Sequence, residues 1–120
     1  MEIRYISIKE TVIGILTDGM INGTADALDL IATAGYNGAS GVVVPMELLT
    51  PAFFDLKTRV AGEILQKCVN YNMRIAIVGD FSVFSSKSLA DFIRESNKGR
   101  HVFFKATVDE AIHSLTSINC

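Results

Sequence analysis

The chain alternates between short apolar runs and longer amphipathic stretches. Five apolar runs have the length and the β-branched content of strands, and they span residues 3–8, 11–16, 41–45, 74–78 and 102–104. Four stretches repeat apolar residues at helical spacing, and they span residues 24–34, 56–71, 86–96 and 108–115. The pattern therefore predicts the element order β-β-α-β-α-β-α-β-α.

This order predicts how the strands pair. Only Lys9 and Glu10 separate the first two runs, which favours an antiparallel hairpin. A helix precedes each later strand, and β-helix-β units pair in parallel with right-handed crossovers. We predict a single α/β domain over residues 1–120, with a mostly parallel sheet of about five strands and four helices that cover at least one of its faces.

Polar residues at three predicted helix starts match capping patterns. Thr24 precedes the first helix, and Asp55 precedes the second, which is expected to be the longest. Thr107 and Glu110 have the spacing of a capping box at the start of the last helix. These caps support the predicted helix boundaries.

Three segments are predicted to meet at one edge of the sheet. Parallel strands bring their carboxyl ends together, and α/β proteins usually bind ligands there. Residues 45–46, 79–82 and 105–106 follow the predicted parallel strands. We therefore look for a functional surface where these three segments converge.

Composition excludes several classes of protein. Hydrophobic residues make up 49% of the 120 residues, too many for a disordered chain. The net charge of −2 gives no electrostatic reason to expect nucleic acid. No apolar run approaches the ~20 residues of a membrane span, and the first residues lack a signal-peptide pattern. Cys68 is expected to be a buried thiol and Cys120 a terminal one, so we predict a reducing, cytoplasmic location.

The sequence contains no complete catalytic, metal-binding or nucleotide-binding motif. His101 and His113 stand without the Cys or Glu cluster that a metal site needs, so we predict no metal and no cofactor. Ser86 and Lys87 do not follow the Gly-x-x-x-x-Gly-Lys-Ser/Thr spacing of a phosphate loop. The interpretation leans towards a protein that is not an enzyme.

Several residues near the predicted edge are candidates for binding a protein partner or a second copy of the chain. Phenylalanines in loops either fill the core or, where they are exposed, mark an interface. Phenylalanine is expected to supply contact area, Asp80 and Lys87 orientation, and Gly79 the loop shape, through a positive φ or a close backbone approach. The candidate surface consists of Phe53, Asp55, Gly79, Asp80, Phe81, Phe84 and Lys87.

An alternative gives some of these residues to a small anionic ligand. Backbone amides, hydroxyls and Lys87 at the helix start near Ser86 could hold the anion, with Asp80 as acid or base. That alternative predicts a concave pocket between Pro45, Asp80 and Lys105. Ordinary helix capping by Ser86 and turn formation by Asp80 explain the same residues.

Six blocks of the sequence resemble a bacterial family described as a domain of unknown function (number 4180). The blocks are residues 26–30, 53–56, 61–67, 75–82, 86–89 and 97–99. The likeness extends over about residues 26–115. It implies a bacterial cytosolic protein and supplies no catalytic residues.

The element order also resembles the anti-sigma-factor antagonist fold, known as the STAS or SpoIIAA-like class. In that class the long second helix begins with Asp-Ser-Ser-Gly, and a serine there accepts phosphate from a partner kinase. The corresponding segment here, residues 55–60, has Thr58 as its only hydroxyl and Arg59 in place of the glycine. The resemblance implies a regulatory protein-interaction module, with Thr58 as the one candidate phosphoacceptor.

Overall fold

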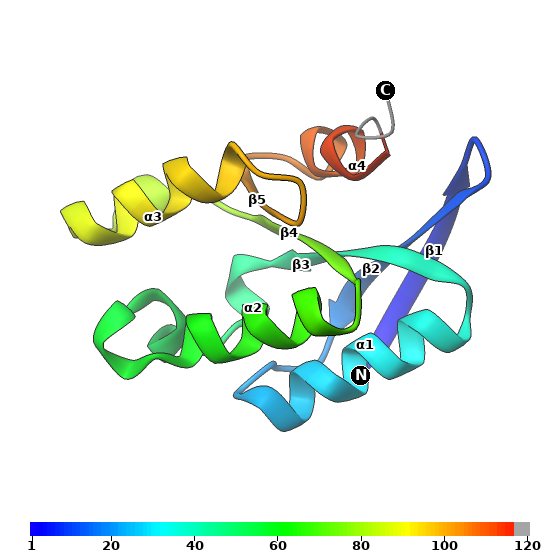
Figure 1. The fold of residues 1–120 in the computed structure, drawn as a ribbon, viewed down its shortest axis with the longest axis horizontal. Coiled ribbons are helices and arrows are strands. Elements are labelled where there is room, and N and C mark those ends of the chain that lie inside the picture. The colour runs from blue at the N-terminus through cyan, green and yellow to red at the C-terminus, as the bar shows by residue number, and fades with distance from the viewer. Residues whose placement is uncertain (117–120) are drawn as a thin grey trace.

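A five-stranded sheet forms the centre of the computed structural model, which describes residues 1–116 (Figure 1). The strands lie side by side in chain order. The first two pair antiparallel and the others pair in parallel. The strands are β1 (Glu2–Ile8), β2 (Thr11–Asp18), β3 (Ala39–Pro45), β4 (Arg74–Val78) and β5 (Val102–Lys105). The predicted Cys120 thiol lies outside the described residues.

Four helices cover the two faces of this sheet. Because consecutive strands are neighbours and crossovers are right-handed, the connecting helices lie on the same face. In Figure 1, α1 and α2 lie below the sheet and α4 lies above it. The helices are α1 (Thr24–Tyr36), α2 (Val60–Asn70), α3 (Lys87–Asn97) and α4 (Val108–Thr116).

The alternation of side chains along the strands creates two apolar cores. Val42 and Val44 belong to the larger core, which includes buried residues of α1, α2 and α3. Val43 points the other way, into a smaller core with Ala111 and Leu115 of α4. β3 therefore buries both faces, which is why its sequence is continuously apolar. The predicted α/β fold class, the order of elements along the chain and the hairpin are confirmed. The order of the strands within the sheet is a finding of the structure that the sequence did not predict.

The second predicted helix begins later than expected. Leu56–Thr58 forms only a 3-10 turn, and Arg59 has a φ of 65°, in the left-handed region. Such a residue ends the turn and redirects the chain, so α2 starts at Val60. The prediction of one helix over residues 56–71 is therefore wrong. α1, with 13 residues, is longer than α2, with 11.

The predicted helix caps have mixed outcomes. Thr24 is the first residue of α1 and its side chain does not cap the helix, so that prediction is wrong. The carboxylate of Asp26 instead accepts the N–H of Asn22 at 2.9 Å, next to the positive end of the helix dipole. The capping box of α4 is confirmed, because the N–H of Glu110 donates to the hydroxyl of Thr107 at 3.1 Å.

Candidate functional site

The carboxyl ends of β3, β4 and β5 meet at one edge of the sheet, as predicted. Pro45 lies opposite Val78 in the β3–β4 register, and Val78 lies opposite Lys105 in the β4–β5 register. The N–H of Gly79 then donates to the carbonyl of Lys105 at 3.1 Å. The loop after β4 therefore starts between two neighbouring strand ends.

Gly79 allows the chain after β3 to approach this loop closely. A Cβ atom at Gly79 would lie 2.6 Å from Cβ of Met46 and 2.9 Å from its Sδ. The φ of Gly79 lies outside the left-handed region. Of the two predicted reasons for this glycine, close approach is the one that the structure supports.

Asp80 stabilises the turn that follows. Its carboxylate accepts the N–H of Ser82 at 3.0 Å and the hydroxyl of Ser82 at 2.5 Å. These two bonds, the hydroxyl bond first, hold the pKa of Asp80 below its usual value. A general base at neutral pH benefits from a raised pKa, so the observed direction favours a structural role in the turn.

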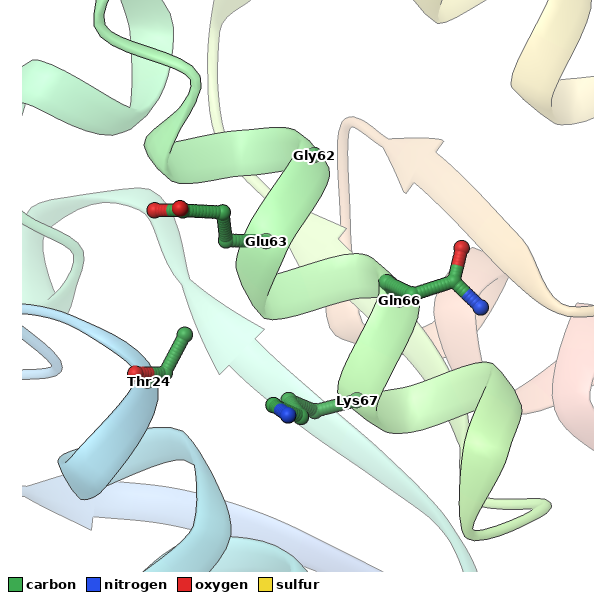
Figure 2. A pocket seen from close by; sticks show the side chains of 5 residues that line it. All are labelled: Thr24, Gly62, Glu63, Gln66 and Lys67. Carbon is green, nitrogen blue, oxygen red and sulfur yellow. The ribbon is translucent and has the colours of Figure 1, made fainter.

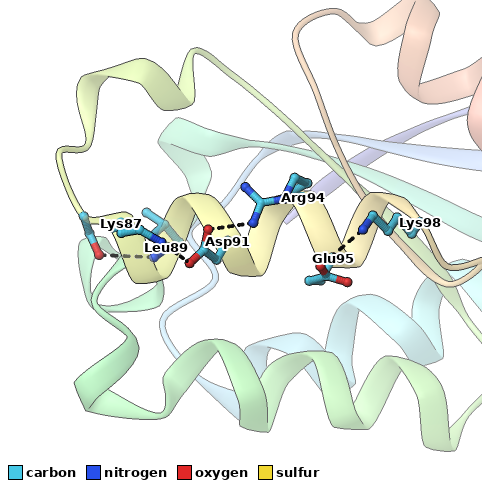
Figure 3. Close-up of polar contacts among 7 residues, drawn as sticks. Lys87, Leu89, Asp91, Arg94, Glu95 and Lys98 are labelled. Carbon is cyan, nitrogen blue, oxygen red and sulfur yellow. Dashed lines mark hydrogen bonds and ion pairs between the residues drawn. The ribbon is translucent and has the colours of Figure 1, made fainter.

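Lys87 lies at the start of α3 and is paired with an acidic residue. Its Nζ lies 3.0 Å from Oδ2 of Asp91, and Arg94 contacts the other oxygen of that carboxylate at 2.7 Å (Figure 3). Both hydrogen bonds, that from Lys87 first, lower the pKa of Asp91. Ser86 caps α3, because its hydroxyl accepts the N–H of Leu89 at 3.1 Å. The helix start is thus a capped terminus with an exposed ion pair.

The predicted aromatic cluster forms, but half of it is buried. The rings of Phe54 and Phe84 stack with centroids 4.8 Å apart, and the rings of Phe81 and Phe104 form a T-shaped pair with centroids 5.3 Å apart. Phe53 is 0% exposed. Its ring belongs to the larger core and has no surface that a partner could contact. The prediction that Phe53 is part of the binding surface is therefore wrong.

A small apolar cavity opens beside the two half-buried rings of Phe81 and Phe84. Its volume is about 170 Å³. We call it the Phe84 cavity, and it is lined by Phe81, Phe84, Ser86, Leu89, Ala90 and Ile93. The side chain of Val83, next to it in sequence, is 65% exposed.

The contribution of α3 to the Phe84 cavity was not predicted, although a sequence signal exists. The four lining residues of this segment follow the spacing i, i+3, i+4, i+7 of one helix face. The anionic-ligand alternative expected a pocket between Pro45, Asp80 and Lys105, and none of these three residues lines the Phe84 cavity.

Asp55 and Thr58 lie in the segment that leads into α2. The carboxylate of Asp55 accepts the N–H of Lys57 at 3.2 Å, so Asp55 caps the 3-10 turn. The prediction that it caps the second helix is wrong, because the residue before α2 is Arg59. The Thr58 hydroxyl lies 2.6 Å from the carbonyl of Ala52 and accepts the N–H of Val60 at 3.2 Å. Both predicted residues are exposed and stabilise this turn.

Two further hollows lie along α1 and α2. A groove of about 470 Å³ is lined by Thr24, Gly62, Glu63, Gln66 and Lys67. Figure 2 shows Thr24 of α1 facing Glu63 and Lys67 of α2. A second groove, of about 340 Å³, is lined by Leu28, Asp29, Ile31, Ala32 and Tyr71. The sequence pattern predicted neither groove, because it does not show which helices become neighbours.

Residues 1–116 lack two features, a cluster of metal-ligating side chains and a membrane-spanning helix. No three His, Cys, Asp or Glu side chains of this part of the chain lie close enough together to hold a metal ion. None of its helices combines the length and the apolar character needed to cross a bilayer.

Comparisons with known proteins show which family the chain belongs to, but they give no relative whose activity is known. The family model described as a domain of unknown function (DUF4180) matches residues 8–115, which confirms the first resemblance and extends it towards the amino terminus. Searches of curated proteins and of solved structures gave no significant match. The resemblance to the STAS class therefore has no support from a solved structure.

Proposed function

We propose that this chain, which belongs to the family described as a domain of unknown function (DUF4180), is a protein-binding module that has no catalytic activity. An apolar side chain of the partner protein enters the Phe84 cavity. The observation that carries the proposal is the position of this cavity, between α3 and the exposed loop that follows β4.

The size and lining of the Phe84 cavity favour a side chain over a small metabolite. Its volume of about 170 Å³ is below the roughly 300–1,000 Å³ of small-molecule sites. Among the described residues that line it, Ser86 alone is polar, and the hydroxyl of Ser86 already caps α3. A polar metabolite would find little to fix its orientation there, whereas an apolar side chain needs only contact area.

The two aromatic rings of the Phe84 cavity are held in place before a partner arrives. Phe84 rests on Phe54, which is 6% exposed, and Phe81 rests on Phe104, which is 4% exposed. Rings fixed in this way lose little freedom on binding, which favours affinity. Aromatic residues that remain partly exposed are also enriched at protein interfaces.

Charged residues of α3, the helix that lines the Phe84 cavity, would orient the partner. Lys87, Asp91 and Arg94 form a chain of ion pairs along the exposed side of the helix (Figure 3). Exposed pairs of this kind contribute little to stability, so they can exchange partners at low cost. Asp80 acts indirectly, by holding the turn that carries Phe81.

The two alternative functions have weaker support. For an anionic ligand, Asp80 and Lys87 would have to leave their present hydrogen-bond partners. For a phosphorylation switch, phosphate on Thr58 would replace the bonds that its hydroxyl makes with Ala52 and Val60. A regulatory role in the bacterial cytoplasm is part of our proposal and rests on the sequence resemblances.

The test is to fill the Phe84 cavity without disturbing the fold. Ala90 is exposed on α3 and lines the cavity, so Ala90→Leu places a larger side chain there. Ala25, an exposed alanine near the start of α1, provides the matched control Ala25→Leu. Peptides selected from a random display library against the wild-type chain are then assayed on both variants.

We expect the selected peptides to contain a large apolar residue and to bind Ala90→Leu at least about tenfold more weakly, because burying one such side chain contributes about 1.5–3 kcal/mol. Binding to Ala25→Leu should be unchanged. Equal binding to both variants would refute the proposal. Amide shifts at Gly79–Ser88 in an NMR titration with inorganic phosphate would favour the anionic-ligand alternative.

A further inference from the structure

We infer that β1 is an open pairing edge, through which two copies of this chain join antiparallel into one continuous sheet. The inference does not depend on the Phe84 cavity. It begins with a difference between the two edge strands, β1 and β5. One edge is closed by a side chain, and the other is not.

The β5 edge is blocked by Asn97. The side-chain oxygen of Asn97 accepts the N–H of Phe104 at 2.8 Å, and its side-chain nitrogen donates to the carbonyl of Phe104 at 3.2 Å. Asn97 thus occupies both of the backbone groups that Phe104 would offer to a further strand. With only four residues, β5 has little edge left.

Three residues of β1 direct their backbone N–H and carbonyl groups away from the sheet. Lys9 and Glu10, with φ values of 50° and 70°, form the two-residue turn between β1 and β2. Hydrogen-bonded pairs therefore alternate from Ile8–Thr11 along the hairpin. The N–H and carbonyl groups of the intervening residues point away from β2, and these residues are Ile3, Tyr5 and Ser7.

These outward groups have no protective partner within residues 1–116. No backbone or side-chain group of the described chain is hydrogen-bonded to the main chain of Ile3, Tyr5 or Ser7. From Ile3 to Ile8 the strand contains no proline and no bulge, which are common devices against edge pairing. Arg4 is the only charged residue in that segment.

The spacing of Ile3, Tyr5 and Ser7 allows β1 of a second copy to pair with β1, and it determines the register of that pairing. If Tyr5 lies opposite Tyr5 of the second copy, Ile3 lies opposite Ser7 on each side, and every outward group is paired in about six hydrogen bonds. If this register shifts by two residues, the outward N–H and carbonyl groups of one of the three residues remain unpaired in each copy. The edge is therefore self-complementary: a second copy pairs with every outward group, and Arg4 lies opposite Ile6, so no like charges face each other.

The same register covers exposed apolar surface. Ile6 and Ile8 lie on the face of the sheet that carries α4, and Ile8 is 36% exposed. In the dimer Arg4 would lie opposite Ile6 of the second copy, so its aliphatic stem covers apolar side chains while its charge reaches water. On the other face, the Tyr5 hydroxyl lies near α1, where Asn37 donates to it at 3.1 Å.

The first test removes one outward donor from each copy. Ser7→Pro deletes an N–H that points away from β2, and proline is tolerated at such positions of edge strands. Ser7→Ala keeps the N–H and is the matched control. In sedimentation equilibrium we expect the wild type and Ser7→Ala to dimerise alike, and the dissociation constant of Ser7→Pro to rise by about ten- to a hundredfold.

The second test checks the register. Arg4→Cys and Ile6→Cys are made in separate chains that also carry Cys120→Ser, and the two proteins are mixed with oxidised glutathione. In the proposed register these residues are a non-hydrogen-bonded pair with Cα atoms about 4.5 Å apart, within disulfide range. The mixture should yield a cross-linked heterodimer, and each variant alone should not.

Several results would overturn the inference. A wild-type chain that stays monomeric at every concentration, or a dimer equally stable with Ser7→Pro, would exclude pairing through β1. Cross-linking of Arg4→Cys alone would show a different register. A monomer whose β1 binds an extended peptide would show that the edge serves another protein. Ala90→Leu should leave dimerisation unchanged, which separates this inference from the proposed function.

Discussion

Replacement of Gly79 by alanine should destabilise the protein through one contact. The new Cβ would lie 2.6 Å from Cβ of Met46, far inside the ~3.5–4.0 Å of an optimal carbon–carbon contact. Because Cβ of Met46 is fixed to the backbone, rotation of the side chain cannot relieve this clash. Insertion of a methyl group into a packed site costs about 1–3 kcal/mol, and we expect about 2 kcal/mol here.

A double-mutant cycle identifies the contact that causes this loss. Met46→Ala removes Sδ and Cγ, at 2.9 and 3.3 Å, but leaves Cβ in place, so it should rescue Gly79→Ala only partly. Met46→Gly removes all three contacts and should recover most of the loss that is attributable to the clash. Gly62→Ala is the matched control, because a Cβ there meets no atom within 4 Å and the site lies inside α2.

Urea unfolding and thermal melting measure these effects. Gly79→Ala should lower Tm by about 6–12 °C, and Gly62→Ala should stabilise the protein by about 0.5–1 kcal/mol. The reasoning is refuted if Gly79→Ala lies within about 0.5 kcal/mol of the wild type. It is also refuted if the cost of Gly79→Ala is the same in the Met46→Gly background, since the clash would then not be its cause.

Three further predictions follow from buried or hydrogen-bonded groups. Ser82→Ala should raise the pKa of Asp80 in an NMR titration, because it removes a hydrogen bond that lowers this pKa. A carboxyl with a depressed pKa in the folded state stabilises the protein only while it is ionised. The variant should therefore be less stable than the wild type at neutral pH, and the difference should disappear as the pH falls below the pKa of Asp80 in the wild type. Cys68 is 2% exposed and burial raises its pKa to about 11, so a thiol reagent should modify it only on unfolding, in a chain whose terminal cysteine is replaced by serine. Asn97→Ala should cost about 1–3 kcal/mol in urea unfolding, because it leaves the backbone groups of Phe104 without their partner; a smaller loss would show that water replaces the side chain.

Local sequence signals predicted most of the fold. The run at residues 74–78 matches β4 at both ends: its central residues Ile75, Ala76 and Ile77 are buried, and Gly79 follows its last residue. The capping box placed the start of α4 correctly, because both of its bonds join residues close in sequence. Signals of this kind depend on neighbours along the chain.

Features that depend on distant contacts were not predicted. The left-handed φ of Arg59, which delays α2, has no marker in the residue type, since arginine rarely adopts it. The burial of Phe53 depends on helices and strands far away in sequence. The Phe84 cavity is an intermediate case: the helical spacing of its α3 residues was visible, but the loop that completes it could be placed only from the structure.

The most direct test of the proposed binding site is to locate a bound side chain. A selected peptide is labelled with ¹³C at the methyl groups of its apolar residue, and intermolecular NOEs to the protein are recorded. We predict NOEs from these methyl groups to the rings of Phe81 and Phe84, and their loss in Ala90→Leu. NOEs from the bound peptide to Thr24 and Lys67, in the groove between α1 and α2, would instead contradict the account.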